Sequence, residues 1–362
     1  MNAASPVITA WSAVSAFGVG RRAFSEGIRE GRLALSSLDR ATWSVGGEAC
    51  LVPNFDPAQL LGRKGTRAMD RATALAVVTV GQLVANDADG LKPSVGSDTA
   101  IVLGTSTGSA SSIMSFTRDS LTQDRPYLVD PAKFPNTVMN CAAGRSAIWH
   151  GLRGPNVTIA GGSASTLLVL NYARRLQRSG RAHSIVCGAV EEFSRERWWL
   201  EWHTREPEQR FHWLGEGCAA LLLEATPRDG RTALAELAAV EVGLPLGESD
   251  VGKTLVSCLQ RALTQAGVTP NDVWAYATSA TGALAEREAI EQVLDGSEAR
   301  ELPCASLLGD TNAASMSLQI AAVLAAAEHA PEAKGRAALV TGIERDGMVG
   351  CAVLRLLSGA AA

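Results

Sequence analysis

Ser163 stands where the local pattern most favours chemistry. It lies in the run GGSAS (residues 161–165), between an apolar segment at residues 157–160 that predicts a strand and a helical pattern at residues 165–179. Glycines permit a sharp turn here, and a helix N-terminus directs N–H groups and the positive end of its dipole at the serine. Two interpretations fit: Ser163 is a nucleophile on a turn, or Ser163 or Ser165 caps the helix.

Cysteines and histidines show no spacing typical of a ligand set. The seven cysteines are far apart and form no CxxC pair, and the five histidines show no HExxH spacing. Free cysteines among apolar neighbours are usually small core residues, so these are predicted to be buried, reduced thiols. The sequence therefore predicts neither a metal site nor a bound cofactor.

Composition limits the classes of partner. Lys and Arg number 33 against 37 Asp and Glu, a net charge of −4, and no dense basic run occurs, unlike in nucleic-acid-binding proteins. The longest apolar stretch, residues 318–327, contains Gln319 and is shorter than the ~20 residues that span a bilayer. The first residues lack the charged and apolar regions of a signal peptide. We expect a soluble, cytoplasmic protein that binds neither nucleic acid nor membrane.

Short β-branched segments alternate with helical patterns along the chain, which indicates an α/β fold. Strands are predicted at residues 6–10, 99–104, 157–160, 184–190, 214–224, 236–243, 273–277, 337–341 and 350–356. Helices are predicted at residues 22–31, 70–86, 109–121, 142–152, 165–179, 252–266, 286–294 and 313–327. Because the second part repeats the layout of the first, we predict two halves, residues 1–228 and 229–362.

A tryptophan-rich segment interrupts the regular pattern. Between residues 192 and 209, Trp198, Trp199 and Trp202 are mixed with charged residues, which predicts a surface or interface loop. Tryptophan is favoured where apolar area meets a polar edge, so packing at a lobe or subunit interface is the expected role of this cluster, ahead of contact with a substrate.

Six segments in order resemble the β-ketoacyl-ACP synthases of the thiolase superfamily. They are VITAWSAVSAFGVGRRAF, RAMDRATALAVV, IVLGTSTGS, FPNTVMNCAAGRSAIWHGLRGPNVT, LQRSGRAHSIVCGAVEEF and LGEGCAALLLEA. The resemblance covers nearly the whole chain. It implies two related α/β halves in a five-layered αβαβα fold, and homologous chains that pair in a dimer.

The sequence departs from active family members at every catalytic position. Those enzymes carry a nucleophilic cysteine on the turn and two later histidines, and here the three positions are Ser163, Thr278 and Asp310. A late glycine-rich loop of the family is replaced by residues 344–350 (ERDGMVG). A serine needs a base, and an aspartate would repel a malonyl carboxylate, so the resemblance implies that condensation does not occur at this site.

A ketosynthase fold without its catalytic residues resembles the chain length factors of type II polyketide synthases. That resemblance implies a heterodimer with an intact ketosynthase, an acyl tunnel at the shared interface, and acyl chains delivered on the phosphopantetheine arm of an acyl carrier protein. The tunnel residues of the family fall on Ala110, Ile113 and Thr117, which share one face of a helix. The small Ala110 implies a deep channel that suits a long chain or a polyene.

Two other functions stay open from the sequence. Ser163 could serve an acyltransferase or hydrolase, assisted by Asp310 or by a remote histidine, since GGSAS differs from GxSxG only at its last residue. The chain could also be a homodimeric scaffold that binds acyl chains without a different partner.

Overall fold

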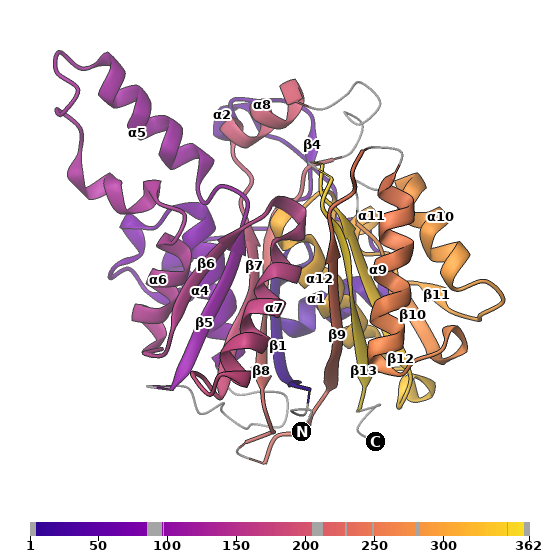
Figure 1. Ribbon diagram of the computed structural model, residues 1–362. Helices are drawn as coiled ribbons and strands as arrows, with labels where there is room; N and C mark the ends of the chain where they lie inside the picture. Colours follow the sequence, from indigo (N-terminus) through magenta and orange to yellow (C-terminus); the bar gives the residue numbers. More distant parts are fainter. Residues whose placement is uncertain are drawn as a thin grey trace.

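Eleven strands form one mixed sheet, in which ten strands repeat the same order twice and the short β2 (Gly18–Val19) pairs with β1 beside them (Figure 1). The computed structural model describes residues 5–84, 96, 98–204, 213–228, 230–247, 250–279, 283–345 and 347–357. The first set runs in the order β6 (Asn156–Ala160), β5 (Thr99–Thr105), β7 (Ser184–Glu191), β8 (Gly217–Glu224) and β1 (Val7–Ser15). The second runs in the order β11 (Arg300–Glu301), β10 (Val273–Ala277), β12 (Ala337–Ile343), β13 (Val349–Leu356) and β9 (Ala235–Gly243).

Both sets also have the same strand directions. In each, the first three strands are parallel and the last two join by antiparallel pairing. The sets meet where Val7 and Ile8 of β1 pair with β9. The predicted fold of two related α/β halves is therefore confirmed. The boundary predicted between residues 228 and 229 falls in the connection from β8 to β9 and stays a prediction, with residue 229 outside the described residues.

Alternate residues of the strands enter different cores, as the two-residue period of a strand requires. In β7, Ile185 and Cys187 pack in the central core, while Val186 and Val190 pack in the outer core of the first half. The outer cores are closed by α4 (Arg71–Val84) and α6 (Cys141–His150) in the first half and by α9 (Val251–Ala266) and α10 (Ala283–Val293) in the second.

The central layer holds α7 (Ser165–Arg178) and α12 (Ser315–Ala327), with α1 (Arg21–Glu30) packed against α12. Nearly every side chain of α12 is buried, as expected of a helix that is apolar on all sides. A 3₁₀ turn precedes each central helix, η3 (Gly162–Ala164) before α7 and η7 (Asn312–Ala314) before α12, and the two turns contact each other. No helix in the described ranges is long and apolar enough to cross a membrane.

Shorter elements complete the described fold. They are β2 (Gly18–Val19), β3 (Ser36–Ser37), β4 (Glu48–Ala49), α2 (Arg40–Trp43), α3 (Pro57–Leu61), α11 (Ala305–Leu308), η1 (Thr66–Ala68), η2 (Pro131–Thr137), η6 (Pro270–Asp272) and η8 (Pro331–Ala333). Helix α5 (Ala110–Thr122) extends away from the sheet (Figure 1), and Ala110 is its one buried residue.

The prediction of a loop around the tryptophans is wrong, because residues Arg195–Thr204 form helix α8. Trp198 and Trp202 are one helical turn apart and stack with ring centroids 5.3 Å apart, and Trp199 stacks on His203 at 5.2 Å. Rings that recur four residues apart fit a helix, but the charged residues around them hide the apolar periodicity.

Candidate functional site

Ser163 lies in turn η3 between β6 and α7, where the sequence pattern places it. The side chain is buried, and its Oγ donates a hydrogen bond to the main-chain carbonyl of Ile343 at 3.0 Å. The N–H of Ser163 donates to the carboxylate of Glu344. Ile343 ends β12 and Glu344 follows it, so both partners of Ser163 come from the second half of the chain.

The cap interpretation of Ser163 is wrong, since its hydroxyl faces across to β12 and leaves the first turn of α7 without a side-chain cap. Ser165 instead holds the turn together. Its Oγ accepts from the N–H of Gly161 at 3.0 Å and donates to the carbonyl of Gly162 at 2.6 Å.

Gly162 permits the approach of Glu344. Its φ of +52° lies in the left-handed region, and a Cβ added there would overlap the Glu344 carboxylate. The chain around Glu344 is itself a tight turn, with the Glu344 N–H bonded to the Met348 carbonyl at 2.7 Å and the Gly347 N–H bonded to the Glu344 carbonyl at 2.8 Å.

Thr278 and Asp310 have separate structural partners. Thr278 follows β10 and donates to Glu301 at 3.1 Å. Asp310 is buried, and its carboxylate accepts from the N–H of Asn312 at 2.8 Å, at the start of turn η7. Thr278 thus bonds a side chain and Asp310 bonds its local backbone, and none of the hydrogen bonds described for Ser163 involves a histidine. His212 lies outside the described residues.

A buried acidic pair, Glu191 and Glu192, lies at the end of β7, and the sequence analysis did not identify it. Glu191 accepts from the Ser106 hydroxyl at 2.8 Å and from the N–H of Ala313 in η7 at 3.4 Å. Burial raises the pKa of Glu191, although Arg197, at 3.9 Å, opposes that shift. Two adjacent acids directly after a buried strand (VEEF) were the available signal for a buried polar site.

Glu192 sits between the starts of two helices. Its carboxyl accepts from Ser109 Oγ at 3.2 Å and the Ser111 N–H at 3.3 Å, at the start of α5, and from the Ala72 N–H at 3.3 Å in α4. Burial, together with the charge of Asp70, raises the pKa of Glu192 to about 8. The side chain is therefore protonated over much of the neutral range.

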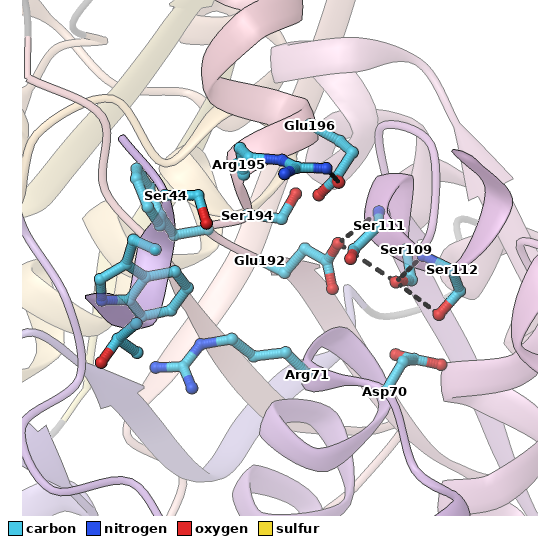
Figure 2. A pocket seen from close by; sticks show the side chains of 13 residues that line it. Ser44, Asp70, Arg71, Ser109, Ser111, Ser112, Glu192, Ser194, Arg195 and Glu196 are labelled. Carbon is cyan, nitrogen blue, oxygen red and sulfur yellow. Dashed lines mark hydrogen bonds and ion pairs between the residues drawn. The ribbon is translucent and has the colours of Figure 1, made fainter. Parts of the chain in front are cut away.

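Glu192 lines a polar cavity of about 360 Å³ (Figure 2). Figure 2 shows Asp70 and Arg71 on one side of it and Arg195 and Glu196 on the other. Arg71 is held from behind by Glu216, whose two carboxylate oxygens accept from its guanidinium at 2.5 Å each. The cavity is thus lined by hydroxyls and by charges that already have partners.

A second, more apolar cavity of about 610 Å³ lies between α5 and α8 and shares Ser44, Arg195 and Glu196 with the first. The α5 residues that line the two cavities are Ser109, Ser111, Ser112, Met114 and Arg118. Neither cavity is lined by the predicted tunnel residues. Ala110 is buried, Ile113 is half-buried and Thr117 is exposed.

Comparison with protein families agrees with this arrangement. The model of the β-ketoacyl synthase N-terminal domain matches residues 5–228. This chain belongs to the β-ketoacyl synthase family. The resemblance derived from the six sequence segments and the α/β fold of the two halves are both consistent with that membership.

Solved structures refine the relationship. The ishigamide ketosynthase/chain length factor is 42% identical with a TM-score of 0.91, over 98% of this chain and 100% of that chain. The predicted resemblance to chain length factors is therefore confirmed. A type II polyketide synthase ketosynthase in complex with its acyl-carrier protein shares the fold, with a TM-score of 0.78 at 20% identity over 98% of this chain and 100% of that chain.

A curated relative is more distant. The 3-oxoacyl-(acyl-carrier-protein) synthase 2 of Synechocystis sp. is 28% identical over 190 residues, which are 51% of this chain and 45% of that protein. The chain thus matches less than half the length of this curated β-ketoacyl synthase.

The cysteines of this family member are not poised for chemistry. All seven are free thiols, and six are buried, as predicted. Burial raises the pKa of Cys50, Cys187, Cys218 and Cys304 to about 12, which keeps them protonated. Among the described residues, no group of three or more His, Cys, Asp or Glu side chains is arranged to hold a metal ion.

Proposed function

We propose that this chain is a non-catalytic chain length factor, which pairs with an intact ketosynthase and forms part of the acyl tunnel in type II polyketide biosynthesis. One observation carries the proposal. The Ser163 hydroxyl donates its hydrogen bond to the Ile343 carbonyl, at 3.0 Å, and a carbonyl oxygen cannot act as a general base. A serine in this setting does not attack a thioester.

The alternative, a Ser163-dependent acyltransferase or hydrolase, needs an oxyanion site as well as a base. The N–H of a nucleophile at a helix start is the group that holds such an oxyanion. Here that N–H is bonded to the Glu344 carboxylate. Asp310, the residue considered as an assistant, bonds the backbone of its own turn instead. These contacts favour the non-catalytic role.

An exposed apolar surface supports a partner chain. From α5 through η2 to α6 the exposed apolar side chains are Met114, Leu121, Tyr127, Leu128, Phe134, Val138, Met139 and Ile148. Strand β6 lies next to them in the fold, at an edge of the sheet. Apolar patches and open strand edges of this kind are typical of protein interfaces. We assign this surface to a catalytically intact ketosynthase, in a cytoplasmic complex supplied by an acyl carrier protein.

A second subunit on this surface would enclose α5, and Ala110, Ile113 and Thr117 would face the resulting tunnel. The indole rings of Trp198, Trp199 and Trp202 on α8 would then lie near the interface, because α8 packs beside α5. The acyl chain arrives on the phosphopantetheine arm of the carrier protein, so this subunit needs no cofactor of its own.

Removal of Ser163 tests the non-catalytic role. In the complex with an intact ketosynthase, Ser163→Ala is expected to leave polyketide formation within about threefold of the parent, because no reacting bond involves its hydroxyl. Size-exclusion chromatography of the co-expressed chains establishes the heterodimer, and mass spectrometry of the products measures the rate. A loss of about a thousandfold, typical of a deleted nucleophile, would support the acyltransferase instead. Failure to bind any intact ketosynthase would support the homodimeric scaffold.

Substitution of Ala110 tests the tunnel. Ala110→Phe adds a ring to a close-packed channel, so the complex is expected to release shorter chains while the initial rate of malonyl consumption is maintained. Ser115→Phe is the control, since position 115 lies roughly 140° around the helix from position 110. Unchanged chain lengths in a folded Ala110→Phe complex would mean that this face of α5 does not set product length.

A further inference from the structure

The carboxylate of Glu344 occupies the N–H of Ser163, at the turn where active relatives carry their nucleophile. We propose that Glu344 is an internal plug, which fills the place of an acyl group at this turn and keeps the vestigial site closed. This inference rests on the proposed non-catalytic function and names the residue that enforces it.

Hydrogen bonding gives the first argument. A backbone N–H at a helix start attracts negatively charged oxygen, because the N–H is otherwise unpaired and the helix dipole is positive there. In acyl transfer such a group stabilises the oxygen that becomes negative. The carboxylate of Glu344 supplies that oxygen permanently, so a thioester carbonyl would have to displace it.

The close contact between Gly162 and the Glu344 carboxylate is the second argument. Gly162 lies directly under the carboxylate, and a Cβ at that position would overlap it. The hydroxyl of Ser163 is turned toward the carbonyl of Ile343, the residue before Glu344. The glycine and the glutamate therefore fit each other, although they are 182 residues apart in the sequence.

Arg345, the residue after Glu344, anchors the loop to helix α8. Arg345 donates to Glu201 at 2.6 Å and to the Thr204 hydroxyl at 2.8 Å, both on helix α8. Together with the backbone turn that joins Glu344 to Met348, these bonds hold the carboxylate in place. The loop that replaces the glycine-rich loop of active relatives thus acts as a latch between β12 and α8.

The other central helix shows the same chemistry at the turn that follows Asp310. The N–H of Ala313 in η7 donates to Glu191, the last residue of β7, just as the N–H of Ser163 in η3 donates to Glu344, which follows β12. The residue before each N–H is left-handed, with φ of +41° at Asn312 and +52° at Gly162. The plug therefore converts a nucleophile turn into a structural turn of the kind already present in the second half.

A thiol placed at position 163 reports whether the site is closed. Iodoacetamide alkylation at that position, located by peptide mass spectrometry, would be compared in Ser163→Cys and in Ser163→Cys combined with Glu344→Ala. We expect the double variant to react at least about tenfold faster, because the carboxylate both blocks the thiol and disfavours its thiolate. Equal rates in the two variants, whether fast or slow, would overturn the proposal.

One further variant separates this effect from damage to the fold. Ser163→Cys with Glu332→Ala, which removes an exposed glutamate in η8, should react like Ser163→Cys alone. If Glu332→Ala accelerates labelling as much as Glu344→Ala does, the effect is not local and the proposal fails. The labelling rates do not depend on polyketide formation, so this result and the Ser163→Ala product assay can fail independently.

Discussion

The start of α12 and the start of α7 are both capped by a glutamate from the opposite half, but the two glutamates are supported differently. Glu191, which caps α12 through Ala313, is fully buried and is also bonded to Ser106 and close to Arg197. Glu344, which caps α7 through Ser163, is half-buried on a loop. The glutamate built into the core bonds the turn that follows Asp310, and the glutamate held by the surface loop bonds the turn that carries Ser163.

The residues that follow the two glutamates extend the contrast. The side chain of Glu192 lies in the interior, where its carboxyl accepts hydrogen bonds from N–H groups at the starts of α4 and α5. The side chain of Arg345 instead lies at the surface, where it donates hydrogen bonds to α8. Loss of Glu191 and Glu192 should therefore destabilise the fold. Loss of Glu344 and Arg345 should mainly expose the site at Ser163.

Removal of Glu191 should have the largest effect. Glu191→Ala leaves the guanidinium of Arg197 buried without its nearest carboxylate, and we expect a loss of about 3–5 kcal/mol in the free energy of unfolding. Glu344→Ala removes one partly exposed hydrogen bond and should cost about 1 kcal/mol. Urea unfolding followed by circular dichroism measures both values. Equal losses would remove the distinction between a core cap and a surface plug.

The pH dependence of stability should also reveal Glu192. Because its pKa of about 8 in the folded chain lies above the unfolded value, the folded state binds the extra proton between those two pKa values. Stability is therefore greatest below the unfolded pKa and falls as pH rises toward 8, by up to about 1.4 kcal/mol per pH unit. Urea midpoints measured from pH 5 to 8 should fall less steeply in Glu192→Gln. The same slope in both proteins would show that Glu192 is not the titrating group.

Local pattern predicted the elements that form from short-range periodicity. The apolar run around α12 and the alternation of strands and helices led to the two-halved fold, and GGSAS placed Ser163 on its turn. Helix α8 was missed because charged residues surround its tryptophans. Pattern could not reveal Glu344 as the partner of Ser163, since tertiary folding alone brings together residues so far apart in sequence. Nor could it show that the cavities beside α5 are lined by Ser111 and Met114 rather than by Ile113.

The position of β1 determines when this chain can complete its core during synthesis. Its first residues lie in the middle of the sheet, between β8 and β9, whose residues are translated more than 200 positions later. Pairing over such sequence distances is slow, because a long loop must close before any contact forms. The first apolar strand to leave the ribosome therefore waits for most of the polypeptide. Because β5, β6 and β7 belong to the same sheet, which reaches β1 through β8, the surface around α5 and β6 becomes available to another subunit only after Glu224, the end of β8, has been translated.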